Sequence, residues 1–375
     1  MGNQCASRAV NLFLCGDVMT GRGIDQILPH PGKPELFESC VRSAAAYVEL
    51  AEQTTGPIAR PVSFDYVWGD ALAELERLRP AARIVNLETA VTTSEEAWPE
   101  KPVLYRMHPS NAPCLTAARI DCCTLANNHV LDWGRPGLAE TLRTLHGAGI
   151  VTAGAGRDVA EAAAPAVIEV SDRVRVLVFA FGLPSSGVPR EWRATRTSAG
   201  VNWIEDLSSR RVDTIASQVA AYARTGDIVV GSIHWGGNWG YAISAREREF
   251  AHGLIDTAGI DIVYGHSSHH VKGIEVYRGK AVLYGCGDML NDYEGISGYE
   301  TYRGELGVMY FPTIDAGSHR LLRLSMIPTQ VRHFRINRAP RDAESWLLQT
   351  LDRECKALET RVQQEPDGTL ALRLE

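Results

Sequence analysis

The chain has 375 residues, of which 45% are hydrophobic and 22% charged, so it can bury one large α/β core or two modest ones. Its formal charge is −7, and its acidic and basic residues are interspersed without the basic stripe that would attract nucleic acid or an anionic membrane surface. No apolar run approaches the roughly 18 residues that span a bilayer, and the stretch 10–15 is too short for a signal peptide, so we expect a cytoplasmic protein.

Short apolar or β-branched runs alternate with helix-like segments along the chain. The expected strands are 9–16, 82–88, 120–127, 174–182, 227–236, 261–267 and 280–288. The clearest helical patterns are 137–149 and 247–259. This alternation is typical of an α/β protein in which a β-sheet core is layered with helices.

Two segments depart from the alternation. The proline-rich segment 28–65 predicts an insertion or lid that carries one helix over 36–53. The end of the chain predicts late strands and then a helix over 342–358. We therefore expect a main domain over 1–312 and a C-terminal addition over 313–375 that packs on the same domain.

Polar side chains that can bind a metal or transfer a proton follow most of the expected strands. They are Asp17, Glu88, Asn128, His129, His234, His266 and Asp288. A helix cap, a tight turn or a buried core histidine would explain any one of these residues. Six strands that end in such residues predict a shared site, because ligand sites in open α/β sheets form at the carboxyl ends of strands. Carboxylate, amide and imidazole ligands without thiolates suit a divalent ion such as Mn, Fe, Ca or Zn.

Six stretches of the chain resemble the successive motifs of the CapA family, which is named for capsule and poly-γ-glutamate biosynthesis. They are LCGDVMTGR, IVNLETAVT, LANNHVLDWGRPGLAETL, SIHWGGNWGY, YGHSSHHVKGIEVYRGK and LYGCGDMLNDYEG. The resemblance runs from about residue 10 to about residue 312. It implies the fold of calcineurin-like metallophosphatases.

The same resemblance implies a ligand set for one metal ion. In metallophosphatases the motif GD-x-H gives the first metal an aspartate and a histidine, but Met19 stands where this histidine would be. The ligands of the second metal match residues that are all present, namely Glu88, Asn128, His234 and His266. We therefore expect one divalent metal ion per chain.

Two His/Asp pairs are expected beside this ion. Asp17 and His269 would have served the first metal, and its loss leaves them as a free pair. His129 with Asp132 forms the second pair, and the histidine that matches His129 in phosphatases is usually a general acid. A carboxylate fixes the tautomer of its histidine, so the two pairs would act as base and acid on opposite sides of a substrate.

This arrangement favours a peptide epimerase that inverts a Cα centre. The chain looks similar to the CapA-like epimerases of lasso-peptide biosynthesis, which invert the C-terminal tryptophan of a ribosomal precursor peptide. That hypothesis implies a peptide substrate, a precursor-recognition partner protein and Ca as the favoured ion. The alternatives are a CapA-type enzyme of poly-γ-glutamate or capsule biosynthesis, a metallophosphatase-like hydrolase, and a scaffold that has lost the reaction.

Further residues are candidates for substrate contacts. Trp235, Trp239 and Tyr241 alternate around glycines and would either place aromatic surfaces beside the metal or pack in the core. Arg106 would hold a substrate carboxylate, whereas a surface salt bridge is the better expectation for Lys101.

Two aspartates and one histidine near these motifs are expected in supporting positions. Asp288 and Asp292 follow a strand and would form a second shell around the metal ligands. His270 would point away from its neighbour His269 if the segment is extended, so we do not expect it to bind the metal.

Overall fold

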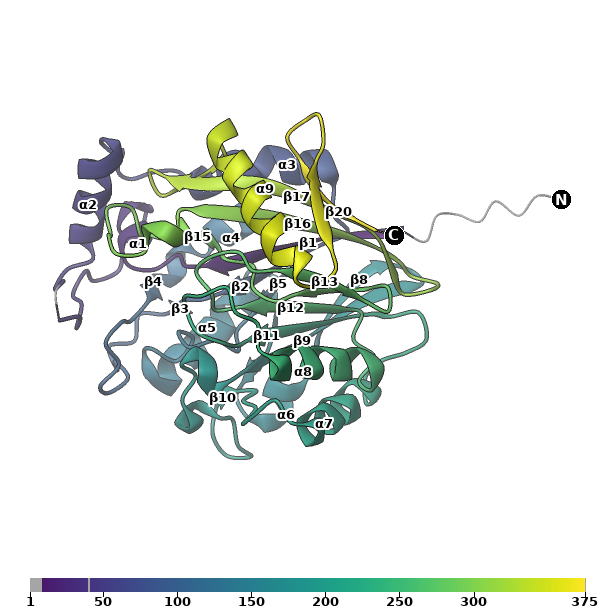
Figure 1. Cartoon of the computed structure of the whole chain (residues 1–375). Helices are drawn as coiled ribbons and strands as arrows, with labels where there is room; N and C mark the ends of the chain where they lie inside the picture. The colour runs from purple at the N-terminus through teal and green to yellow at the C-terminus, as the bar shows by residue number, and fades with distance from the viewer. Residues whose placement is uncertain (1–8, 40, 375) are drawn as a thin grey trace.

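Two β-sheets pack face to face at the centre of the computed structural model, which describes residues 9–39 and 41–374 (Figure 1). In the larger sheet of the described chain the strand order is β19-β20-β17-β16-β1-β2-β5-β6, with β15 beside β1 and β18 beside β17. Its strands are β1 (Ala9–Val18), β2 (Ala82–Leu87), β5 (Cys122–Thr124), β6 (Val151–Ala153), β15 (Asp288–Leu290), β16 (Leu306–Asp315), β17 (Arg320–Arg332), β18 (Arg335–Arg338), β19 (Arg361–Gln364) and β20 (Leu370–Arg373).

The second sheet has the order β13-β14-β12-β11-β9-β8. Its strands are β8 (Ala166–Ser171), β9 (Val174–Gly182), β11 (Ile228–His234), β12 (Ile262–His266), β13 (Ile274–Tyr277) and β14 (Lys280–Leu283). Two small pairs lie outside both sheets, β3 (Ala90–Val91) with β4 (Arg106–Met107) and β7 (Ala155–Gly156) with β10 (Gly200–Val201).

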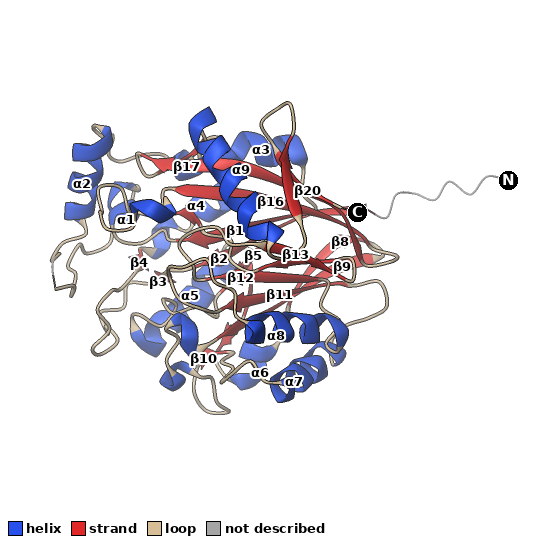
Figure 2. Ribbon diagram, viewed as in Figure 1, coloured by secondary structure: helices blue, strands red, loops and turns tan. Residues whose placement is uncertain are grey.

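Helices cover the outer faces of the two sheets, as Figure 2 shows for α7 and α8 below the second sheet. The helices are α1 (Gly23–Ile27), α2 (Ala45–Thr55), α3 (Ala71–Leu78), α4 (Pro113–Ala117), α5 (Gly134–Gly147), α6 (Val159–Ala163), α7 (Ser209–Ala220), α8 (Ala245–Asp256) and α9 (Arg341–Lys356). A capping box formed by Ser244 and Glu247 fixes the start of α8.

The alternation of side chains along β1 explains the layers. Leu12 and Leu14 pack between the two sheets, whereas Phe13 and Cys15 pack on the opposite face, in the apolar cluster that contains α2 to α5. Successive side chains of a strand point to opposite faces, so an apolar strand can serve both layers at once. The predicted α/β class, with a sheet core layered with helices, is confirmed.

The insertion and the C-terminal part differ in detail from the expected elements. In the segment 28–65 the helix α2 begins at Ala45 rather than near residue 36, because backbone hydrogen bonds from Leu36 to Arg42 and from Ala44 to Pro34 close a loop before it. After residue 313 the chain continues the larger sheet through β17 to β20, and α9 packs on β17 and β19. The division into a main domain and an addition stays a prediction.

Candidate metal centre

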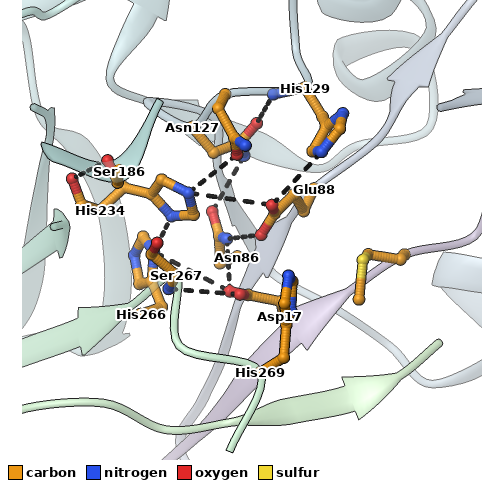
Figure 3. Close-up of polar contacts among 12 residues, drawn as sticks. Asp17, Asn86, Glu88, Asn127, His129, Ser186, His234, His266, Ser267 and His269 are labelled. Carbon is orange, nitrogen blue, oxygen red and sulfur yellow. Dashed lines mark hydrogen bonds and ion pairs between the residues drawn. The ribbon is translucent and has the colours of Figure 1, made fainter. Parts of the chain in front are cut away.

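Strand ends from both sheets bring distant parts of the sequence to one buried site (Figure 3). In the larger sheet, Asp17 at the end of β1 lies opposite Asn86 of β2 on one side and Asp288 of β15 on the other. In the second sheet, His234 at the end of β11 lies opposite His266 at the end of β12. Because these neighbouring strands are parallel, their polar side chains lie at the same edge of each sheet.

The first ligand group contains Asp17, His234 and His266, whose ligand atoms lie within 4.8 Å of one another. The Nδ1 atoms of the two histidines are 2.7 Å apart, and Oδ1 of Asp17 lies 4.0 Å from Nδ1 of His266. Asn128 Oδ1 is 2.9 Å and Glu88 Oε1 3.8 Å from Nε2 of His234. The structure therefore brings the four expected ligands together and adds Asp17 as a fifth donor.

The second ligand group contains Asp17, His269 and Asp288. The sequence predicted a pair between His269 and Asp17, but Nδ1 of His269 hydrogen-bonds to Oδ1 of Asp288 at 2.9 Å instead. The parallel register of β1 and β15 explains this difference, because it sets Asp288 beside Asp17. Asp288 therefore contacts this histidine directly, whereas the sequence placed it in a supporting shell.

Asn86 frames both ligand carboxylates and was missed in the sequence. Its Nδ2 donates to Asp17 Oδ1 at 2.7 Å and to Glu88 Oε2 at 3.3 Å, and its own Oδ1 accepts from Asn127 Nδ2 at 3.0 Å. The available signal was its position two residues before Glu88, which places both side chains on the same side of the extended chain.

Two serines also support the ligands without a signal in the sequence. Ser232 Oγ lies 2.6 Å from Nε2 of His266, and this contact fixes the ring. Ser267 has a φ of 103°, in a region that L-residues rarely adopt, and its backbone N–H donates to Asp17 Oδ2 at 3.3 Å. This strained backbone conformation directs the N–H of Ser267 toward the carboxylate of Asp17.

The predicted pair of His129 and Asp132 is present. His129 Nδ1 lies 2.6 Å from Asp132 Oδ2, and its Nε2 lies 3.8 Å from Glu88 Oε1. The expectation of a surface salt bridge for Lys101 is wrong, because its Nζ is buried, 2.6 Å from Asp132 Oδ1 and 2.9 Å from His129 Nδ1. The loop that carries Lys101 packs against the site instead of facing solvent.

The electrostatics of the site favour a bound cation. Burial and the charge of Asp288 raise the pKa of Asp17 to about 7, and burial together with the charge of Asp17 raises the pKa of Glu88 well above its usual range. Burial lowers the pKa of His234 and brings that of His266 to about 3. The crowded carboxylates repel one another. A bound cation would remove this repulsion and accept the lone pairs of the neutral imidazole nitrogens.

This donor set fits a divalent metal ion. Two imidazole nitrogens, two carboxylates and an amide oxygen, without a thiolate, form a mixed hard and borderline set. The residues that would hold a divalent cation are Asp17, Glu88, Asn128, His234 and His266. Hydrogen bonds from Asn86 and Ser267 orient Asp17, and Ser232 orients the ring of His266.

A cavity of about 650 Å³ opens beside the second ligand group. His269 is the member of the ligand groups that lines it, together with Tyr105 and Tyr293. The helix α2 of the insertion and the segment after β15 form much of its wall, so the insertion lies where a lid would be useful. That role stays a prediction.

The predicted substrate contacts divide into those at the cavity and those elsewhere. Trp239 lines the cavity, and Tyr241 packs nearby against His270. Trp235 lies in the core instead, stacked on Tyr284 with its Nε1 bound to that residue's carbonyl. His270 accepts from the N–H of Gly240 at 3.1 Å, and its exclusion from the metal ligands stays a prediction.

Two further predictions need correction. Arg106 does not line the cavity, because its guanidinium stacks on Trp133 and donates to the carbonyls of Ser94 and Lys33. Asp292 does not support a metal ligand directly but accepts two hydrogen bonds from the buried guanidinium of Arg22, at 3.1 and 2.6 Å.

A family model described as bacterial capsule synthesis protein PGA_cap matches residues 11–293. This chain belongs to that family. The PGA_cap match confirms the predicted relationship to CapA proteins and the metallophosphatase-like fold.

Named relatives cover most of the chain. A probable polyglutamine synthesis accessory protein of Mycobacterium tuberculosis is 49% identical over 362 residues, which are 96% of this chain and 95% of that relative. The PGA biosynthesis protein CapA of Bacillus subtilis is 24% identical over 74% of this chain and 62% of its own length. The capsule biosynthesis protein CapA of Bacillus anthracis is 22% identical over 76% of this chain and 60% of its own length.

These names overturn the epimerase hypothesis. The relatives are named for polyglutamine synthesis and for capsule or PGA biosynthesis, so the prediction of a peptide isomerase is wrong and the alternative is favoured. The preference for Ca falls with it, because it depended on that reaction. In the described residues, 9–39 and 41–374, no helix is long and apolar enough to cross a membrane.

Proposed function

We propose that this PGA_cap protein is a metal-dependent hydrolase that acts on amide bonds of a glutamate-family polymer during its synthesis. The observation that carries the proposal is the cluster of Asp17, Glu88, Asn128, His234 and His266. Through Asp17 it adjoins the second ligand group, whose His269 lines a cavity of about 650 Å³, large enough for several residues of a chain. The names of the relatives support the polymer as substrate.

The ion is proposed to be Mn, Fe or Zn, one per chain, held by the first ligand group. Two imidazole nitrogens favour these ions over Ca, which takes oxygen ligands. The bound ion supplies Lewis acidity toward the carbonyl of the scissile amide. A single ion is proposed because Met19 stands where a histidine ligand of another metal would be.

His129 is proposed as the group that moves the proton. Asp132 holds its Nδ1 at 2.6 Å, which leaves Nε2 directed toward Glu88 and the ligand cluster. Burial lowers the pKa of His129 to about 4, so the ring is neutral and Nε2 can accept a proton. The ring takes this proton from the attacking water and returns it to the leaving amine nitrogen, so the step releases one acid and one amine.

His269 is proposed to act on the cavity side of the site. Although burial opposes it, the charge and hydrogen bond of Asp288 raise the pKa of His269, so this ring carries a proton more readily than the other histidines of the site. Its Nε2 lies 3.5 Å from the hydroxyl of Tyr293. A charged donor there would orient a substrate carbonyl that enters from the cavity.

The test uses the protein loaded separately with Mn²⁺, Fe²⁺ and Zn²⁺ and incubated with glutamine and glutamate oligomers in ¹⁸O-labelled water. We expect shorter chains that carry one ¹⁸O per cut, and no cuts with His129→Ala. His146→Ala is the matched control, because His146 lies on α5 and contacts Thr152 rather than the site. Hydrolysis of an aryl phosphate ester without any chain cleavage would overturn the proposal in favour of a phosphatase.

A further inference from the structure

The cavity beside His269 has an exposed rim and a buried inner end. Tyr299 at the rim is 49% exposed, whereas His269 and Tyr105 are buried, so these two residues mark the inner end. Tyr293 also lines the cavity, and its ring packs edge-on against that of His269, with centroids 5.4 Å apart and an interplanar angle of 83°. Tyr293 therefore stands where the cavity meets the second ligand group.

The ring of His269 directs one nitrogen toward Tyr293. Its Nδ1 is engaged by Asp288, so Nε2, on the other side of the ring, faces the hydroxyl of Tyr293 at 3.5 Å. The same hydroxyl lies 3.8 Å from Sδ of Met19, and a thioether is a weak acceptor. Hydrogen bonds of hydroxyl groups are normally about 3 Å long or shorter, so both polar atoms keep hydrogen-bonding capacity that these contacts do not use.

A third polar group, behind Tyr293, is also incompletely used. The hydroxyl of Tyr105 is buried beside that of Tyr293 and has no hydrogen bond of normal geometry in the described residues. Buried polar groups without a full partner are rare, because each one costs free energy. Three polar groups from separate parts of the chain thus meet at the inner end of the cavity with hydrogen-bonding capacity to spare.

The chain around Tyr293 is held in place by its own hydrogen bonds. Oδ1 of Asn291 accepts from the backbone N–H of Tyr293 at 3.2 Å, and Nδ2 of Asn291 donates to Asp288 at 2.8 Å. The neighbouring Asp292 binds the buried guanidinium of Arg22. Groups that are ordered in advance lose little conformational entropy when a ligand binds, so this arrangement favours recognition.

Tyr105 connects the inner end of the cavity to the proposed proton-moving group. Its ring packs edge-on against the ring of His129, with centroids 4.6 Å apart and an interplanar angle of 81°. A substrate group held at Tyr293 is thus separated from His129 by the ring of Tyr105. This position suits an amide that neighbours the scissile bond rather than the scissile bond itself.

We propose that the hydroxyl of Tyr293 and Nε2 of His269 form a subsite that binds an amide of the substrate chain next to the bond that is cut. A hydroxyl both donates and accepts, and an amide offers an oxygen acceptor and an N–H donor, so one amide fills the unused capacity of this pair. This inference rests on the proposed function and deepens it, because it adds Tyr293 to the residues that contact the substrate and gives Tyr105 a supporting position behind it.

The test measures binding without turnover, in the Mn²⁺-loaded His129→Gln protein. Short oligomers of glutamine and of glutamate are titrated by calorimetry into this parent and into the same protein with Tyr293→Phe, which removes only the hydroxyl. We expect the oligomer that binds the parent more tightly to lose about tenfold in affinity. Unchanged affinity, or failure of both oligomers to bind the parent, would overturn the inference.

The matched control in the same cavity is Tyr299→Phe. Tyr299 lies at the rim, and the substitution removes its hydroxyl but keeps the ring that stacks on Trp239. This variant should bind the oligomer like the parent. An equal loss of affinity with Tyr299→Phe and Tyr293→Phe would overturn the assignment to the inner end.

Denaturant unfolding separates a ligand contact from a structural one. The contacts of the Tyr293 hydroxyl are long, so Tyr293→Phe should unfold like the parent. Tyr105→Phe removes a buried hydroxyl without a full partner, so it should keep or raise stability while affinity falls about threefold. Its control is Tyr310→Phe, another buried hydroxyl without a partner but in the core between the sheets, which should leave affinity unchanged. Lower stability of Tyr293→Phe in step with its affinity would show a structural role and overturn the inference.

The two proposals fail separately. Binding that depends on the Tyr293 hydroxyl, without any cleavage by the metal-loaded wild-type protein, supports the subsite and refutes the hydrolase. Cleavage by the wild-type protein together with unchanged binding in Tyr293→Phe refutes the subsite and leaves the hydrolase intact.

Discussion

His234 and His266 lie directly opposite each other on the parallel strands β11 and β12, and their Nδ1 atoms are 2.7 Å apart. At this distance one Nδ1 carries the proton of a hydrogen bond and the other accepts it, and Oδ1 of Asp17 lies 4.0 Å from Nδ1 of His266. Burial keeps both rings neutral. When that proton leaves, the two Nδ1 atoms can both bind a cation beside Asp17.

Asn86 is expected to stabilise the ligand carboxylates in the absence of metal. Asn86→Ala removes its two donor contacts and should lower the free energy of unfolding by about 2 kcal/mol. Asn86→Asp removes the same donors and adds a negative charge, so it should destabilise the metal-free protein more and recover more stability when Mn²⁺ is added. Denaturant unfolding with and without Mn²⁺ measures both effects, and equal behaviour of the two variants would contradict the prediction.

Arg22 is expected to hold the insertion to the segment after β15. Its buried guanidinium binds Asp292 and Glu38, and it packs on the ring of Tyr47. Arg22→Lys cannot bind both carboxylates in the same way and should lower the free energy of unfolding by about 3 kcal/mol. Faster proteolysis within 28–65 should accompany this loss.

The control for Arg22 is Arg60→Lys, because Arg60 pairs with Glu52 on the surface of the same insertion. Surface pairs contribute little, so this variant should unfold like the wild type. A similar loss of stability in both variants would show that the buried pairing is not the cause.

Gly16 is expected to be required by the close approach of β1 to the chain before β15. A Cβ at this position would lie 1.8 Å from the carbonyl oxygen of Gly287, which accepts from the N–H of Asp17. Gly16→Ala should therefore cost about 3 kcal/mol of stability. Gly147→Ala is the control, since nothing lies within 4 Å of its added Cβ, and it should be neutral or slightly stabilising.

His319 is expected to give the stability of the protein a pH dependence away from the metal centre. Its hydrogen bond to Asp261 raises the pKa of His319, so the folded state binds this proton more tightly than the unfolded chain. The stabilisation is complete below the unfolded pKa of about 6.5 and is lost as pH rises through the raised folded pKa. His319→Asn should thus lower Tm more at about pH 5.5 than at about pH 9, and an equal loss at both would contradict the sign.

The sequence predicted the α/β class and the strand-end residues because both follow from local patterns. Asp17, Glu88, His234 and His266 each end an apolar run, and parallel strands must bring such ends together. The motif resemblance then assigned them to one site. Periodicity and motif order were enough for this level of description.

The partners of the site depended on register and on tertiary packing. The sequence pattern around His269 could not predict that its partner is Asp288 and not Asp17. That contact depends on the pairing of β1 with β15. The burial of Lys101 and the turn of Arg106 toward Trp133 are likewise decided by how their loop packs. The reaction was misjudged for a different reason: the epimerase hypothesis relied on a resemblance and a ligand count, whereas the relatives that match are named for polyglutamine synthesis and capsule or PGA biosynthesis.

Metal binding by the first ligand group is tested most directly by calorimetric titration of the metal-free protein with Mn²⁺ and Zn²⁺, together with elemental analysis. The account predicts one ion per chain, with affinity reduced about tenfold or more in His234→Ala and in Asp17→Asn and unchanged in His146→Ala. A wild-type protein that retains no metal, or the same affinity in all three variants, would contradict it.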